Sequence, residues 1–428
     1  MLNQYQIMMN KSQILYEKLQ KHHSRKINLS LNRINLALKK LNNIHRKINN
    51  PINIIGSDGK FFLVQSLKAF IESNNQKVST FTSPHLYDFR HRFWLNDRYI
   101  NINEMKKNIK IINKLKVKLT LFEITSLIYY LSASKLKNSS YALVEAGLMF
   151  VGDSTRVWKS PKFQIITNIN KQHLEWVKPK TIKEICKQKV GFLSNSTTIY
   201  VGKQKKKTMK IIKEILKKNP SKKIFYGKDW SVKKLVNKII YKDNKGIILI
   251  NSAMIKSEAM MDNLGLSIKI ARDLNVSKKN IMRAIPKINY EGRIQWIKNG
   301  KLVKRLYKRE NLLVDGCHSE TSAKNLALYL KTLNKDIYGI WGMQKNKQPS
   351  KFIKEFKGIF KKVIAIKIPD EPNSCQPIYL KNVANRHGIN CEVAPNLNAG
   401  IKRISSKKEK VITSFGSLYL VGKLLSLN

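Results

Sequence analysis

"INIIGSDGKFFLVQSLKAF" (residues 52–70) sets a glycine-containing turn between a β-branched run and a helical pattern. The opening INII predicts a buried strand, and the apolar residues that follow the turn predict a helix. The glycines of GSDGK (56–60) allow a tight turn whose N–H groups can point at phosphate oxygens, next to a helix N-terminus. Lys60 would add a mobile cation, but Phe61 and Phe62 stand where such loops carry a Ser or Thr. Local evidence alone leaves two interpretations open, a phosphate loop or an ordinary turn.

Strand-like and helix-like runs alternate on both sides of this stretch. The strand-like segments in the first part of the chain are 52–55, 77–83, 141–147, 163–169, 197–202 and 245–250. The helical patterns between them are 61–74, 122–135, 181–193 and 258–274. This alternation predicts βαβ units and a mostly parallel sheet.

A turn within 287–301, in which a short strand pair opens, separates a second series from the first. The strand-like segments of this second series are 311–316, 337–342, 362–368, 389–394 and 410–416. The sequence therefore predicts two α/β domains. Residues 1–290 would form a P-loop-containing, mostly parallel sheet domain with an N-terminal helical segment, and residues 291–428 a smaller Rossmann-like domain.

The chain is strongly basic, with 82 Lys and Arg against 27 Asp and Glu in 428 residues, a formal charge of +55. Such a balance suggests nucleic acid first. However, the lysines are spread along the chain among many Asn and Ile, residues that AT-rich codons favour. We therefore expect small anionic substrates, and nucleic-acid binding stays an alternative.

Targeting and redox features point to a reducing compartment. The four cysteines form no CxxC pair. No run of about 18 apolar residues occurs, and the N-terminus lacks the apolar core of a secretion signal. We expect a cytoplasmic protein with no membrane partner.

Polar residues stand at the predicted strand ends, where open parallel sheets bind ligands. Ser83, Glu145 and His173 follow or end three successive strands and form a plausible ligand set for Mg²⁺ beside nucleotide phosphates. Each has an ordinary alternative, since Ser-Pro often begins a turn and a lone histidine is more often structural. Asp315, at another strand end, could accept from ribose hydroxyls or stabilise a helix N-terminus.

Taken in order, these segments resemble the folylpolyglutamate synthase / dihydrofolate synthase family of the Mur ligase-like group. GSDGK stands where the family has G-T-N-G-K-G-S, and TSPHLYDFRHR (82–92) resembles T-S-P-H-L-x-x-F-x-E-R. ITNINKQHLEW (166–176) stands for I-T-x-I-x-x-D-H, VDGCHS (314–319) for L-D-G-A-H-N, and FGSLYLVG (415–422) for G-S-L-Y-L-V-G. KINLSLNRINLALKKL (26–41) also resembles the family's N-terminal segment, so the match runs over nearly the whole chain.

The resemblance implies an ATP-dependent carboxylate–amine ligase that works through an acyl phosphate. Its substrates would be ATP, L-glutamate and either dihydropteroate or a folate with a free γ-carboxylate, and its metal Mg²⁺. Related enzymes are usually monomers. A Mur-type ligase with another acceptor is an alternative, against which LTLFE (119–123) and the C-terminal segment favour folate.

Site residues carry over position by position. The residues matched to ATP binding are Gly56, Ser57, Asp58, Gly59, Lys60, Asn263, Arg293, Asp315 and His318. The residues matched to the metal are Ser83, Glu145 and His173, and those matched to the pterin are Thr120, Phe122 and Asp153. Catalytic roles fall to Lys60, Lys189 and His318, and Lys189 matches the lysine that is carbamylated in the family.

The chain departs from the family at several glycine or polar positions. The departures are Phe61, Phe62, Met149, Phe150, Arg156, Gln172 and Ser319. They motivate a second hypothesis, a degenerate, non-catalytic relative that binds folate or a protein partner.

Overall fold

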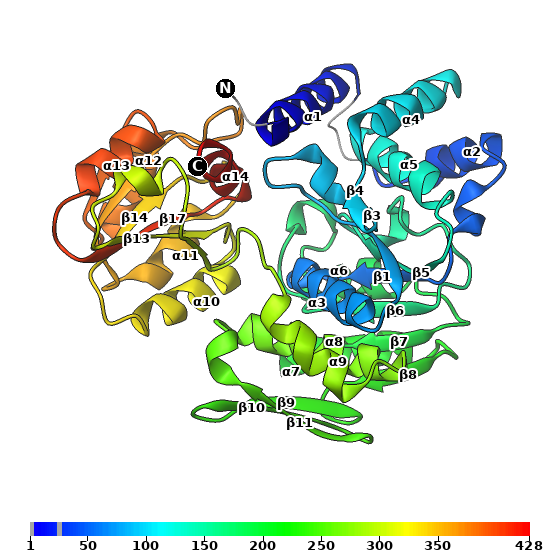
Figure 1. Ribbon diagram of the computed structural model, residues 1–428. Helices are drawn as coiled ribbons and strands as arrows, with labels where there is room; N and C mark the ends of the chain where they lie inside the picture. Colours follow the sequence, from blue (N-terminus) through cyan, green and yellow to red (C-terminus); the bar gives the residue numbers. More distant parts are fainter. Residues whose placement is uncertain (1–3, 24–27) are drawn as a thin grey trace. The chain divides into compact units, whose positions relative to one another are not determined.

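The structure is a computed structural model that describes residues 4–23 and 28–428, with side chains from residue 11 onward (Figure 1). Lys26 and Ile27, which begin the N-terminal segment of the family resemblance, lie outside the described residues. The chain divides into two compact units. The N-terminal unit comprises Met1–Ile255 and Ala259–Asn289, and the C-terminal unit comprises Lys256–Glu258 and Tyr290–Asn428.

The N-terminal unit is built on an eight-stranded sheet with the order β4-β3-β2-β5-β1-β6-β7-β8. Its strands are β1 (Pro51–Ile55), β2 (Lys77–Phe81), β3 (Phe93–Asn96), β4 (Arg98–Tyr99), β5 (Ser139–Glu145), β6 (Phe163–Ile166), β7 (Thr198–Val201) and β8 (Lys222–Phe225). The six strands from β2 to β8 in this order are parallel, and only the pairings of β3 with β2 and with β4 are antiparallel. The mostly parallel sheet predicted from the alternating pattern is confirmed.

Helices cover both faces of this sheet (Figure 1). They are α1 (Gln4–His22), α2 (Asn32–Lys40), α3 (Lys60–Ser73), α4 (Ile102–Lys114), α5 (Leu121–Ala133), α6 (Ile182–Val190), α7 (Lys206–Leu216), α8 (Glu258–Asp273) and α9 (Lys278–Ala284). Every residue of β1 is buried, Asn53 included, which is why this strand is mostly apolar rather than alternating. Because β1 lies between β5 and β6 and is parallel to both, the carboxyl ends of these three strands are neighbours at one edge of the sheet.

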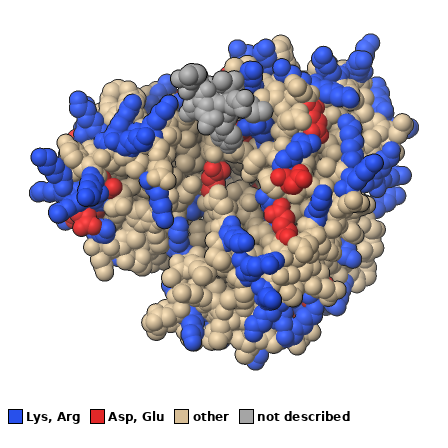
Figure 2. All heavy atoms as spheres, in the orientation of Figure 1, with Lys and Arg blue, Asp and Glu red and all other residues tan. Residues whose placement is uncertain are grey.

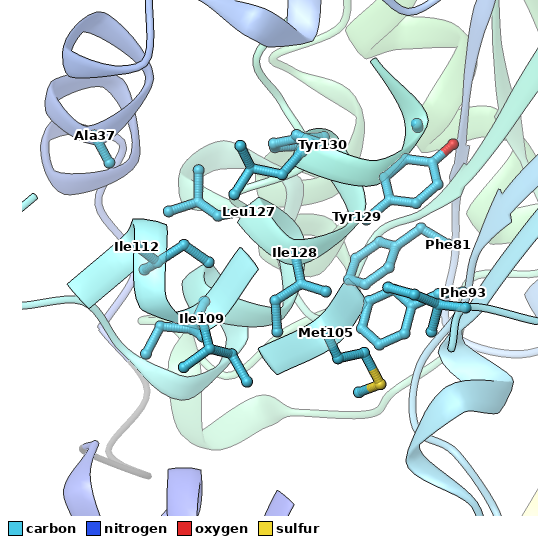
Figure 3. Close-up of a cluster of buried hydrophobic side chains, with 14 of the residues drawn as sticks. Ala37, Phe81, Phe93, Met105, Ile109, Ile112, Leu127, Ile128, Tyr129 and Tyr130 are labelled. Carbon is cyan, nitrogen blue, oxygen red and sulfur yellow. The ribbon is translucent and has the colours of Figure 1, made fainter. Parts of the chain in front are cut away.

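An aromatic and aliphatic core includes residues of strand β2 and of helix α5 (Figure 3). The rings of Phe81 and Tyr129 stack with centroids 5.4 Å apart, and the Tyr129 hydroxyl lies 2.9 Å from Ser79 Oγ. Tyr130 donates to the carbonyl of Ser154 at 2.7 Å. Burying each such side chain contributes roughly 2 kcal/mol, so this core holds the end of β2 and the start of α5 in place.

A separate three-stranded antiparallel sheet was not predicted. Its strands are β9 (Trp230–Lys234), β10 (Lys238–Asp243) and β11 (Gly246–Asn251), in the order β11-β10-β9. The assignment of residues 245–250 to the parallel series is therefore wrong, although the segment is a strand. Its alternating burial belongs to a sheet with one face in water, which an antiparallel arrangement permits.

The C-terminal unit contains a six-stranded sheet with the order β12-β13-β17-β14-β15-β16. Its strands are β12 (Gln295–Ile297), β13 (Glu310–Asp315), β14 (Ile337–Trp341), β15 (Phe360–Ala365), β16 (Cys391–Val393) and β17 (Lys410–Phe415). Its helices are α10 (Glu320–Lys331), α11 (Pro349–Ile353), α12 (Pro377–Arg386), α13 (Leu397–Ile404) and α14 (Leu418–Leu427). All five strand-like segments of the predicted second series are strands, and β12 adds an antiparallel edge.

The surface carries the basic composition in a dispersed form. On the face shown in Figure 2, Lys and Arg side chains are scattered, with few Asp and Glu between them. In the part of the chain that the structure describes, no helix has the length and apolarity that crossing a membrane requires.

Candidate functional site

The 56–60 loop joins β1 to α3 and has the backbone geometry of a tight cradle. Gly59 has φ +88° and a Cβ there would lie 2.4 Å from the Asn263 amide. A Cβ on Gly56 would lie 1.9 Å from Thr167 Oγ1. Glycine is therefore required at both positions by close approach, and at Gly59 also by a left-handed backbone.

The residues that follow β6 hold this loop from one side. The N–H groups of Ser57 and Asp58 donate to the Asn168 carbonyl at 2.8 and 3.2 Å. Thr167 Oγ1 donates to the Asp58 carbonyl at 2.7 Å. Helix α3 begins at Lys60, directly after the loop, and the N–H groups at a helix start can bind an anion.

Lys60, Ser83 and Glu145 come together beside the loop. Glu145 ends β5 and is 4% exposed, and its Oε1 lies 3.8 Å from Lys60 Nζ. The Ser83 N–H donates to Glu145 Oε2 at 3.1 Å. Lys60 Nζ also donates to the Gly56 carbonyl at 3.3 Å. A buried carboxylate is thus paired with a cation and a backbone dipole, next to a loop suited to phosphate.

His173, the third predicted metal ligand, sits on the segment after β6 in a left-handed conformation with φ 60°. Its Nδ1 lies 3.7 Å from Glu175 Oε1. Among the described residues no cluster of three or more His, Cys, Asp and Glu side chains is placed to hold a metal. The predicted set of Ser83, Glu145 and His173 contains only two side chains of these four types, so it could not be such a cluster. The role of His173 as a metal ligand stays a prediction.

Lys189, on α6, is a buried amine held by backbone carbonyls. It is 2% exposed, and its Nζ donates to the carbonyl of Gly56 at 3.1 Å and to that of Leu148. Burial first, and then the charge of Lys60, lower the pKa of Lys189 to about 7, although nearby Asp153 acts in the opposite direction. A large fraction of this amine is therefore neutral near neutral pH, whereas an exposed lysine is almost wholly protonated.

The residues predicted for the pterin lie around the start of α5 and the loop after β5. Thr120 is the N-cap of α5 and forms a capping box with Glu123. The Phe122 ring packs so closely on Gly147 that a Cβ there would lie 2.6 Å from it. Asp153 is 3% exposed, and its carboxylate accepts from the N–H groups of Gly147, Leu148 and Thr155 and from the Thr155 hydroxyl. Asp153 thus shapes the wall of this region in the structure.

The predicted ATP residues fall in both units. Asn263, on α8 of the N-terminal unit, packs against Gly59. Asp315, at the end of β13 in the C-terminal unit, accepts from the N–H groups of Ile294 and Cys317 at 2.8 and 2.7 Å. Burial raises the pKa of Asp315, although the nearby Arg293 guanidinium opposes this.

His318 lies just after β13, with its Nδ1 2.9 Å from the Gly316 carbonyl. Ser319, one of the departures from the family, is the N-cap of α10 and forms a capping box with Ser322. The departure therefore keeps a polar cap at this helix start.

The departures in the N-terminal unit differ in their burial. Phe61 and Phe62 are half-buried in the first turn of α3, whereas Met149 and Phe150 are fully buried in the core. Arg156 lies over the Phe192 ring at 5.3 Å, and within the described chain its Nε is buried without a hydrogen-bond partner.

Sequence reasoning missed the contribution of the segment after β6. Asn168, Asn170 and Gln172 contact the loop through their backbone or side chains. The run of amides in NINKQ was a signal, since amides supply both donors and acceptors.

Comparison with known proteins finds one matching domain family in each of the two units. Residues 91–284 match the Mur ligase middle domain, and residues 300–427 match the dihydrofolate synthetase C-terminal domain. The 56–60 loop precedes the first of these matches.

Individual relatives span most of the chain. The Bacillus subtilis dihydrofolate synthase/folylpolyglutamate synthase is 23% identical over 331 residues, which cover 72% of this chain and 74% of that protein. E. coli FolC in complex with DHPP and ADP superposes with a TM-score of 0.84 at 17% identity over 96% of each chain. The bifunctional enzyme of Yersinia pestis complexed with AMPPNP and a Mn ion gives 0.82 at 16% identity over 97% of each chain.

The domain matches, the curated relative and the shared fold agree with one another and with the motifs along the sequence. The chain belongs to the folylpolyglutamate synthase / dihydrofolate synthase family of ATP-dependent ligases.

Proposed function

We propose that this protein uses ATP to join L-glutamate to a pteroyl carboxylate, either that of dihydropteroate or the γ-carboxylate of a folate. The observation that carries the proposal is the meeting of Lys60, Ser83 and Glu145 beside the 56–60 loop. An ordinary turn would need neither a half-buried cation nor a buried carboxylate at this edge of the sheet.

The loop and Lys60 would bind the phosphates. First-turn N–H groups of α3 supply fixed dipoles, and Lys60 supplies a charge that can follow the γ-phosphate. Both are preorganised by the protein, so they stabilise charge without reorganising during the reaction. Asn263 supports the loop at Gly59, where the backbone turns into the helix.

The oxygen ligands at this edge fit a magnesium ion. Glu145 offers a buried carboxylate and Ser83 a hydroxyl-bearing side chain next to it, and Mg²⁺ prefers oxygen ligands together with substrate phosphates. We assign Ser83 and Glu145 to hold the ion, with His173 as the third proposed ligand. A bound ion would neutralise charge between the phosphates and the attacking carboxylate.

The proposed chemistry has two steps. An oxygen of the pteroyl carboxylate attacks the γ-phosphorus of ATP, ADP leaves, and an acyl phosphate forms. The glutamate amine then attacks the acyl carbon after losing a proton, an amide bond forms, and phosphate leaves with the carboxylate's oxygen. The residues of this chain bring several anions together, and that is where the largest electrostatic cost lies.

We further propose that Lys189 becomes carbamylated. Its lowered pKa provides the neutral amine that attacks CO₂. The carbonyl oxygens of Gly56 and Leu148 now accept from this amine and would repel a carbamate. A carbamate at Lys189 therefore needs a cation beside it, so we expect carbamylation to depend on divalent metal.

The test is ligation by the purified chain with ATP, Mg²⁺, glutamate and, separately, dihydropteroate or tetrahydrofolate. We expect one ADP for each amide formed. Glu145→Gln should lower kcat and raise the Mg²⁺ concentration needed for half-maximal rate. The matched control Glu409→Gln changes an exposed glutamate paired with Lys335 in the C-terminal unit and should leave both values unchanged.

The competing function is a non-catalytic relative that binds a pterin or a protein partner. The two phenylalanines in the first turn of α3 favour it, because they replace a small residue and a hydroxyl at the loop. The absence of ADP formation with either acceptor would support that alternative and contradict the ligase, whereas stoichiometric MgATP binding would argue against the alternative.

A further inference from the structure

A carboxylate stands inside the 56–60 loop, and the segment after β6 binds it. The Asp58 carboxylate accepts from Gln172 Nε2 at 3.0 and 3.1 Å and from Asn170 Nδ2. The amide orientations follow from the chemistry, because an ionised carboxylate only accepts and each amide must turn its NH₂ group toward it. Asn170 Oδ1 is correspondingly buried with no donor among the described residues.

Further contacts close the same two segments against each other. The Asn170 N–H donates to Ser57 Oγ at 3.2 Å, and Ser57 Oγ lies 3.4 Å from the Asn170 carbonyl. Asp58 also forms an isolated antiparallel bridge with Asn168. The loop is therefore fixed along its length by residues more than 100 positions away in the sequence.

The carboxylate needs this arrangement if the loop binds a nucleotide. A negative charge beside ATP phosphates is repulsive, and the repulsion is largest when the carboxylate is free to turn toward them. Charge-assisted hydrogen bonds from two amides hold the carboxylate in one orientation. The negative charge of Asp58 also raises the pKa of Lys189, which offsets part of the lowering caused by burial.

We propose that Gln172 and Asn170 are positioning residues that bind the Asp58 carboxylate and thereby fix the 56–60 loop for the nucleotide. The proposal rests on the proposed function for its nucleotide. It also accounts for a pair of differences from the family, because the resemblance has an asparagine where this chain has Asp58 (G-T-N-G-K-G-S) and an aspartate where it has Gln172 (I-T-x-I-x-x-D-H). In both cases the pair would consist of one amide and one carboxylate, with their positions exchanged.

The exchange defines a double-mutant cycle in the full-length protein. Its members are the wild type, Asp58→Asn, Gln172→Glu and the double variant. Asp to Asn and Gln to Glu keep side-chain size, and the double variant has the same net charge as the wild type. Additive effects of charge on nucleotide binding cancel in the cycle, which leaves the coupling between the two positions.

The readouts are the Kd for MgATP by calorimetry and the unfolding temperature. Gln172→Glu should weaken MgATP binding at least about tenfold, because two carboxylates then face each other. The double variant should return to within about threefold of the wild type. Gln76→Glu, the same change in the turn between α3 and β2, is the matched control and should not alter the Kd.

The outcomes separate this proposal from the ligase. Gln172→Glu and the double variant binding equally weakly, or coupling in unfolding temperature without coupling in Kd, would overturn the positioning role. Wild-type protein that binds MgATP and shows the coupling but ligates no glutamate would uphold the positioning role and contradict the ligase. Wild-type protein that binds no MgATP would overturn both.

Discussion

Replacing Lys189 by Met should remove a pH dependence of stability that the wild type carries. The amine is 2% exposed and its pKa is lowered to about 7, chiefly by burial. In the unfolded chain the same amine has an ordinary pKa of about 10.4. Between these two values the unfolded chain binds one proton that the folded chain does not, so the wild type becomes more stable as pH rises through this window.

The size of the effect follows from the shift. Well inside the window, each pH unit adds about 1.4 kcal/mol to the free energy of unfolding of the wild type. At the folded pKa half of the Lys189 amines are already neutral, so the gain per pH unit is smaller there. Between pH 7 and pH 9 the wild type should therefore gain roughly 2 kcal/mol relative to Lys189→Met. Below about pH 6 the difference should be constant, because the amine is then protonated in both states.

The assay is urea unfolding at several pH values from 6 to 9 in CO₂-free buffer, since carbamylation would consume the neutral amine. Lys187→Met, at an exposed position on the same helix, is the control and should track the wild type. A difference between wild type and Lys189→Met that does not change with pH would refute the reasoning about burial.

Three other predictions concern the loop and its surroundings. Gly59→Ala places a Cβ 2.4 Å from the Asn263 amide at φ +88°, so it should weaken MgATP binding by more than about tenfold; calorimetry that finds an unchanged Kd would contradict this. Thr120→Ala removes the capping box of α5 and should lower the free energy of unfolding by about 1 kcal/mol, with Thr120→Ser recovering most of it in the same urea titration. Phe62→Ser restores a small hydroxyl residue in the first turn of α3 and should raise kcat for glutamate ligation, whereas a lower kcat would show that the ring is part of a working site.

The sequence predicted the repeating part of the fold well because burial on both faces leaves a direct pattern. The strand β1 and residues 312–314 of β13 are buried and mostly apolar, and helical patterns separate the strands. In the small sheet, β9 and β10 were missed because they carry lysines at exposed positions, and β11 was predicted as a strand but assigned to the wrong sheet. Their pairing also depends on turns that the pattern does not mark.

The candidate site was predictable in its positions and less so in its contacts. Strand ends of a parallel sheet meet at one edge, which is why Ser83 and Glu145 could be expected to lie near the loop. The burial of Lys189 and the four bonds that Asp153 accepts depend on segments distant in sequence, and no local pattern reveals them. No local pattern reveals the hydrogen bonds from the Asn170 and Gln172 amides to the Asp58 carboxylate either.

The central claim is that ATP activates a pteroyl carboxylate for attack by glutamate. The most direct measurement incubates the protein with ATP, Mg²⁺, glutamate and an acceptor labelled with ¹⁸O in its reacting carboxylate, and then analyses the released phosphate by mass spectrometry. An acyl-phosphate route predicts one ¹⁸O in each phosphate and one amide for each ADP. Amide formation with unlabelled phosphate would contradict the proposed chemistry, and the absence of both amide and ADP with either acceptor would contradict the ligase itself.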